Sequence, residues 1–82
     1  MTEIDGFREE LASIDREIME LVGRRNRIAL VIGEKKAEAN EEVVVPAVEK
    51  NVVRRYIDAG KISGVSAETA ARIARAVIDE SV

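Results

Sequence analysis

The sequence predicts an all-α protein with three helices per chain, one of them a long N-terminal helix, assembled as an intertwined homodimer. Three observations lead to this fold class. Apolar residues recur at helical spacing over residues 4–32 with no proline among them. Pro46, the single proline of the chain, and Ser66 are well suited to begin two later helices. The first predicted helix is also too long for the globule that 82 residues can form.

The first helix is expected from about residue 4 to residue 39. Steps of three and four residues separate its apolar positions, which is the spacing of a coiled-coil or bundle helix, and Arg25 interrupts the series once. Thr2 and Asp5 are suited to cap the first turn. We refer to these apolar positions as the seam of the first helix: Ile4, Phe7, Leu11, Ile14, Ile18, Leu21, Ile28 and Ile32.

The second helix is predicted to begin at Pro46 and to end at Gly60, with residues 40–45 as the connection before it. Its apolar face comprises Val48, Val52, Tyr56 and Ala59. The third helix is predicted to begin at Ser66, a good N-cap residue. Its inner stripe comprises Ala70, Ile73, Ala74, Val77, Ile78 and Ser81.

The length of the first helix predicts the dimer. A helix over residues 4–39 would be roughly 53 Å long at ~1.5 Å per residue. A compact domain of this size has a radius of gyration of only about 12 Å, so the helix extends beyond any globule its own chain can form. The seam stays apolar along the extension, and a second copy across a two-fold axis is the simplest cover for it.

Composition narrows the chemistry that the chain can perform. It has no His and no Cys, which excludes imidazole acid–base catalysis, thiol nucleophiles, disulfides and the usual zinc sites. The absence of Cys is compatible with a reducing cytoplasm, where we expect the protein. A net charge of −3 argues against general nucleic-acid binding, and no apolar run is long enough for a membrane span. We expect one domain over residues 1–82, with no metal and no cofactor.

Two cations lie where the seam should be buried. Arg25 occupies a seam position, and Lys36 follows eleven residues later on the same side, about 16 Å along the axis. An unpaired charge is costly in such a place. Arg25 therefore forms a structural ion pair with Asp15 or Glu49, fixes the register of the helices at some loss of stability, or binds an anionic ligand. Periodicity alone does not separate these interpretations. In an antiparallel dimer, Arg8 of the partner could complete a site for a small dianion with both cations.

With these residues placed, the sequence resembles the all-helical, dimeric (type II) class of chorismate mutases. The resemblance rests on three stretches that cover nearly the whole chain: "FREELASIDREIMELVGRRNRIALVIGEKK", "VVVPAVEKNVVRRYIDAGK" and "ETAARIARAVIDESV". It implies an enzyme that converts chorismate to prephenate, a step of phenylalanine and tyrosine biosynthesis, by an intramolecular Claisen rearrangement. This unimolecular reaction needs no metal, cofactor, nucleophile or proton transfer. The enzyme holds a compact substrate conformer and stabilises charge that develops on the ether oxygen.

The resemblance also implies roles for individual residues. Arg25 and the Arg8 of the partner would hold substrate carboxylates, and Lys36 would contact a carboxylate and the ether oxygen. Glu49 would bind the ring hydroxyl. The implied catalytic residues are thus Lys36, Arg25 and Glu49, and Ser81 would meet a carboxylate while the backbone amide of Val45 lines the site.

Three positions depart from the family pattern. Many members have Asp where this chain has Val45 and Arg where it has Val48. Many also carry a Gln or Glu one turn after the matched Ser81, at position 85, whereas this sequence ends at Val82. From that departure we expect an 82-residue form to be a weak mutase.

Two rival functions share this fold. One is an isochorismate-pyruvate lyase, although lyases of this fold tend to have a shorter connection than the stretch between Lys36 and Pro46. The other is a non-catalytic dimerisation or regulatory module, since such domains also occur fused to other enzymes of the aromatic pathway. Turnover of chorismate and of isochorismate separates the three functions.

Overall fold

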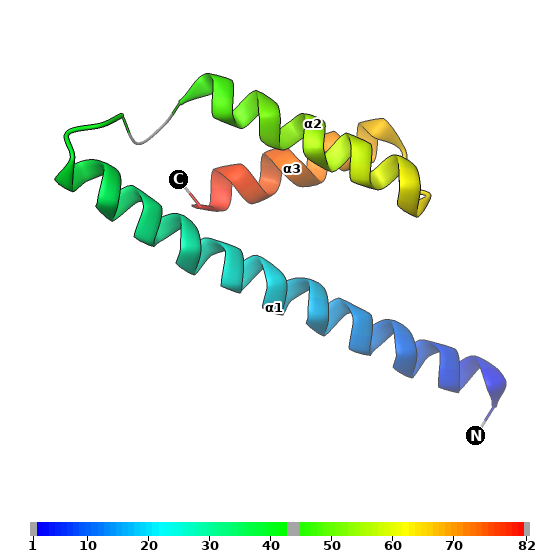
Figure 1. Cartoon of the computed structure of the whole chain (residues 1–82). Coiled ribbons are helices and arrows are strands. Elements are labelled where there is room, and N and C mark those ends of the chain that lie inside the picture. Colours follow the sequence, from blue (N-terminus) through cyan, green and yellow to red (C-terminus); the bar gives the residue numbers. More distant parts are fainter. Residues whose placement is uncertain (1, 43–44, 82) are drawn as a thin grey trace.

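The computed structural model describes residues 2–42 and 45–81, and within them the chain forms three helices and no strand. Helix α1 spans Glu3–Glu38, α2 spans Pro46–Ser63 and α3 spans Ala67–Ser81. The predicted all-α class and the long N-terminal helix are confirmed. Helices α2 and α3 run side by side in opposite directions, and α3 also contacts the C-terminal half of α1 (Figure 1).

Hydrogen bonds from neighbouring residues cap both ends of α1. The Thr2 hydroxyl accepts a hydrogen bond from the Asp5 backbone N–H at 3.2 Å, and the Asp5 carboxylate accepts one from the Thr2 N–H at 3.1 Å. This reciprocal pair is the predicted capping box. At the other end Asn40 adopts a left-handed conformation with φ 58°, which asparagine tolerates better than most residues. The Glu41 N–H then donates to the Lys36 carbonyl at 2.8 Å and closes the last turn.

The sequence predicted that the second helix ends at Gly60, but α2 continues to Ser63. The residue with the left-handed conformation that ends the helix is Gly64, with φ 81°. Gly60 is buried inside α2 because α3 packs closely there: a Cβ on Gly60 would lie 3.1 Å from the Ala70 Cβ and 3.2 Å from the Val65 carbonyl oxygen. The glycine therefore permits a close helix contact rather than a turn.

The buried residues of the chain lie where α2 and α3 pack together. Ser66 caps α3 as predicted, because its hydroxyl accepts a hydrogen bond from the Thr69 N–H at 3.2 Å. The predicted inner stripe of α3 is largely confirmed, but Ile73 is 47% exposed and Val48 of α2 is 50% exposed. Among the described residues, the buried apolar side chains are Val52, Ala70, Ala74, Val77 and Ile78.

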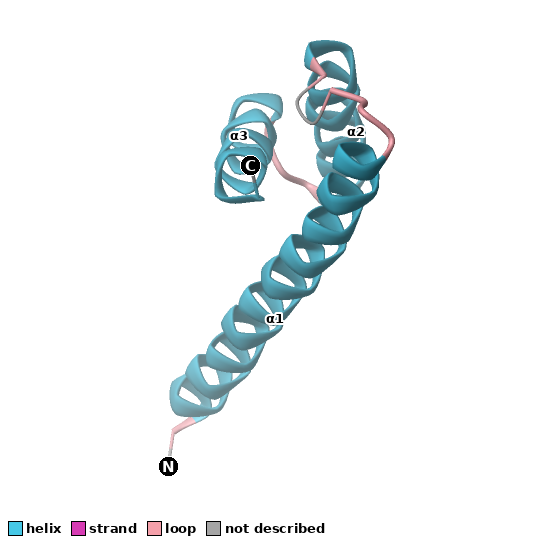
Figure 2. Cartoon of the chain, turned by 90° about the vertical axis from the view of Figure 1, so that its left-hand side faces the viewer, coloured by secondary structure: helices cyan, strands magenta, loops and turns pink. Residues whose placement is uncertain are grey.

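Helix α1 is left largely uncovered. No residue of α1 is buried, and seam residues such as Phe7, Leu11 and Ile18 are 57%, 59% and 51% exposed. The chain measures 58 × 24 × 16 Å, with a radius of gyration of 16.2 Å, because the N-terminal half of α1 extends away from the other two helices (Figure 2). Within residues 2–42 and 45–81, no helix is long and apolar enough to cross a membrane.

The close contact at Gly60 gives a stability prediction. Gly60→Ala should lower the free energy of unfolding by about 1–2 kcal/mol, because the new Cβ would lie too close to the Val65 carbonyl oxygen and to the Cβ of Ala70. Gly6→Ala is the matched control, since a Cβ there meets nothing within 4 Å, and it should be neutral or stabilising by up to ~1 kcal/mol. Thermal unfolding followed by circular dichroism measures both. Equal stability of the two variants would contradict the packing described here.

Candidate functional site

A hollow of about 150 Å³ lies where the three helices approach one another near the C-terminal end of α1. Helix α1 contributes one wall, the start of α2 with the residue before it contributes the second, and the end of α3 contributes the third. Most of the lining is apolar. The lining residues are Arg25, Ala29, Ile32, Gly33, Lys36, Val45, Val48, Glu49, Val52, Ile78 and Ser81.

Five of the six residues predicted for the site line this one hollow: Arg25, Lys36, Val45, Glu49 and Ser81. They come from all three helices and from the segment just before α2, so the fold brings together residues far apart in the sequence. Arg8 does not line the hollow. It lies 17 residues before Arg25 on the same continuous helix, roughly 25 Å away along the axis.

Arg25 is held by a hydroxyl group. Its Nη1 donates a hydrogen bond to the Ser81 Oγ at 3.3 Å, which connects α1 to the end of α3. The Ser81 Oγ in turn lies 3.0 Å from the Val77 carbonyl oxygen, to which it can donate. The ion pairs formed within the described part of the chain do not include Arg25, so the structural pairing with Asp15 or Glu49 is absent there. Within the described residues, the guanidinium is thus bonded to a neutral hydroxyl and paired with no carboxylate.

Glu49 pairs with a residue that the sequence did not point to. Its Oε1 accepts a hydrogen bond from the Arg75 Nη2 of α3 at 3.3 Å. Arg75 follows Ala74 on α3, and its position in the sequence does not distinguish it from any solvent-exposed charge. Only the rotation of α3 against α2 brings it to Glu49, and no pattern within either helix encodes that rotation. The sequence shows only that one predicted helix has an acidic residue and another has a basic one. Such combinations are common, so they do not predict a particular ion pair.

The electrostatic character of the hollow suits a small anion. Arg25 and Lys36 contribute two positive charges and Glu49 contributes one negative charge, against walls formed by Ile32, Val52 and other apolar side chains. Charges interact more strongly beside such walls than in open water. Among residues 2–42 and 45–81, no group of three or more acidic residues lies close enough together to bind a metal ion.

Comparisons with known proteins identify the family. The family model for chorismate mutase type II matches residues 7–82, so the chain belongs to the type II chorismate mutase family. It is 29% identical over 76 residues to a bifunctional chorismate mutase/prephenate dehydratase of Buchnera aphidicola subsp. Schizaphis graminum, an alignment that covers 93% of this chain and 20% of that protein. It is 36% identical over 58 residues to an intracellular chorismate mutase of Mycobacterium tuberculosis (strain H37Rv), which covers 71% of this chain and 55% of the relative.

The chain thus spans between one fifth and about half of the length of these curated relatives. No solved structure matches the chain at a significant level. The family is confirmed as the sequence resemblance predicted it, and the same class of all-helical fold is present here.

Proposed function

We propose that this chain is a chorismate mutase that rearranges chorismate to prephenate. The observation that carries the proposal is the meeting of Arg25, Lys36, Glu49 and Ser81 in one apolar-walled hollow. Membership of the type II chorismate mutase family supports it. The substrate has two carboxylates, a ring hydroxyl and an ether oxygen that gains negative charge as its C–O bond breaks. The hollow offers two cations for the carboxylates and the ether oxygen, and one carboxylate that can accept a hydrogen bond from the ring hydroxyl.

In the proposed mechanism the residues of this chain bind and orient the substrate. Arg25 holds one carboxylate, with Ser81 fixing the guanidinium from α3. Lys36 contacts a carboxylate and the ether oxygen, where it stabilises charge that increases in the transition state. Glu49 accepts a hydrogen bond from the ring hydroxyl, and the backbone amide of Val45 borders the substrate. The apolar walls exclude water and keep the reacting ends of the substrate together.

We further propose that the active form is a homodimer in which each site is completed by the partner's α1. The uncovered seam supports this, because Ile4 and Leu11 are each 59% exposed in the single chain. The place of Arg8, far from Arg25 on one helix, supports it too, since Arg8 can serve only a site other than the one lined by its own Arg25. A cytoplasmic location is proposed as well, in keeping with the name of the mycobacterial relative, an intracellular chorismate mutase.

An assay with two substrates tests the proposed activity. Loss of chorismate absorbance with formation of prephenate, and no release of pyruvate from isochorismate, is the expected result. Pyruvate release from isochorismate at a higher kcat/KM would identify a lyase instead. Chorismate binding without turnover would identify a binding or regulatory module on this fold.

Mixing two inactive variants tests the shared site. Arg8→Ala and Arg25→Ala chains should each be inactive alone but regain activity when they are unfolded together and refolded as a mixture. If the chains pair at random, about half of the dimers are heterodimers with one of two sites intact, which gives about a quarter of wild-type activity. Native mass spectrometry quantifies the heterodimer. Heterodimers that form but remain inactive would refute the contribution of Arg8 from the partner.

A further inference from the structure

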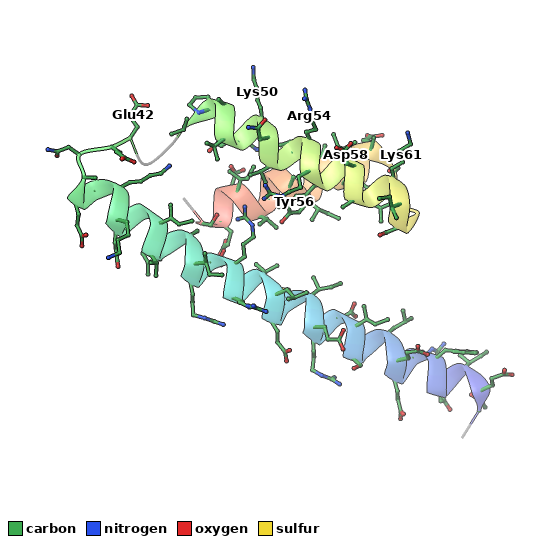
Figure 3. The ribbon with its side chains drawn as sticks, viewed as in Figure 1. Glu42, Lys50, Arg54, Tyr56, Asp58 and Lys61 are labelled. Carbon is green, nitrogen blue, oxygen red and sulfur yellow. The ribbon has the colours of Figure 1, made fainter. Side chains whose placement is uncertain are left out.

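A second hollow shares Glu49 with the candidate site. It is a groove along α2 that is lined by Pro46, Val53, Ile57 and other α2 residues, and by Arg75 from α3. Figure 3 shows Lys50 and Arg54, two further residues of this groove, pointing away from α1. Glu49 lines both the groove and the site, whereas Arg75 lines only the groove. Arg75 therefore reaches the Glu49 carboxylate from outside the site.

Arg75 has two carboxylate partners. Its Nη2 lies 3.3 Å from the Glu49 Oε1, and its Nε lies 4.0 Å from the Oδ1 of Asp79, one turn further along α3. The Arg75 side chain is 50% exposed and that of Glu49 is 26% exposed. Ion pairs this accessible to water contribute little to stability. The Arg75–Glu49 pair therefore adds little to the packing of α2 against α3. Its main effect is on the position of the Glu49 carboxylate.

Glu49 has competing partners inside the site. It lines the same hollow as Arg25 and Lys36, yet its ion pair is formed with Arg75 and not with either of those cations. A carboxylate released from Arg75 would be attracted to Lys36 or Arg25 across an apolar-walled space. It would then occupy the positive charges that the proposed function reserves for the carboxylates of the substrate.

We infer that Arg75 is a positioning residue that holds the Glu49 carboxylate away from Lys36 and Arg25, so that both site cations stay free for the substrate. This inference rests on the proposed function for its kinetic consequence, but the contact itself can be tested without a substrate. Arg75 does not line the candidate site and does not reach the reacting atoms, so it acts only through Glu49. Its loss should therefore have no effect once the charge of Glu49 has been removed.

The kinetic test is a double-mutant cycle. Arg75→Gln should raise the KM for chorismate roughly three- to fivefold, as expected for loss of a half-exposed ion pair, with kcat changed less than about twofold. Arg75→Lys keeps the charge and should restore most of the affinity. In a Glu49→Gln background, Arg75→Gln should leave KM unchanged. Arg72→Gln is the matched control, because Arg72 lies one turn earlier on α3 and pairs with Glu68 outside both hollows.

A spectroscopic test uses the ligand-free protein. The carboxyl carbon signal of Glu49 and the ε-methylene signal of Lys36 should both move in the NMR spectra of Arg75→Gln, and neither should move in Arg72→Gln. The Lys36 signal should return to its wild-type position when Glu49→Gln is added. A wild-type protein that does not convert chorismate refutes the proposed function only, and the NMR arm then decides the inference by itself. An unchanged KM in Arg75→Gln, an equal KM effect with and without Glu49, or unmoved NMR signals would overturn it.

Discussion

Lys36→Met should lower kcat for chorismate by roughly 10²- to 10³-fold, which corresponds to about 3–4 kcal/mol of lost transition-state stabilisation. The reason is that the ether oxygen gains charge only as the C–O bond breaks, so a cation beside it acts mainly on the transition state. Methionine keeps most of the apolar stem of lysine. Lys36 lines the hollow together with apolar side chains and is not buried, so the variant should fold normally.

The neighbouring residue gives the matched control for this experiment. Lys35 is 74% exposed, pairs with Glu38 and does not line the hollow. Lys35→Met removes the same charge from the same turn of α1 and should leave kcat and KM nearly unchanged. Steady-state kinetics of both variants, with circular dichroism as a check on folding, makes the comparison. Near-normal kcat in Lys36→Met, or equal losses in both variants, would remove Lys36 from the mechanism.

Ile14→Asp should abolish the folded protein at micromolar concentration. Ile14 is 44% exposed in the single chain, and the proposed dimer buries it in the seam against the partner. An unpaired carboxylate at such a position, together with the lost apolar contact, costs about 2–5 kcal/mol in each chain, and a dimer contains the change twice. A single chain has no buried residue in α1, so there is little to keep a monomer folded. Loss of the helical circular dichroism signal is therefore expected.

Arg16→Asp introduces the same residue two positions later, on the opposite face of α1 from Ile14. It should keep both the helical signal and the dimer mass in analytical ultracentrifugation. A folded, monodisperse monomer of Ile14→Asp would contradict the intertwined dimer. Loss of folding in both variants would show that α1 tolerates no added aspartate on either face. The experiment would then give no support to burial of the seam in a dimer.

The sequence predicted those features that depend on one helix at a time. The first helix, predicted over residues 4–39 from its apolar repeat and the absence of proline, agrees with α1 to within a residue at each end. Ser66 and Pro46 gave the starts of the other helices, because capping and the missing proline N–H act locally. Gly60 was misread, since a glycine within a helical pattern signals either an end or a close contact, and only the packing of Ala70 against it decides.

The features that depend on two helices were harder to predict. Ile73 fits the apolar stripe of α3 but is 47% exposed in the single chain. Helix periodicity placed Arg25 and Lys36 on one side of the first helix, and the family resemblance alone added Glu49 and Ser81 to the same site. The bond from Arg25 to Ser81 and the pair of Glu49 with Arg75 follow from the way α3 sits against its neighbours. No periodicity within one helix contains that information.

Conversion of chorismate by the purified protein is the most direct measurement of the central claim. Proton NMR of the reaction mixture should show chorismate replaced by prephenate as the sole product. The initial rate should be proportional to protein concentration and should fall sharply with Lys36→Met but not with Lys35→Met. A wild-type rate no higher than that of chorismate in buffer alone would contradict the account.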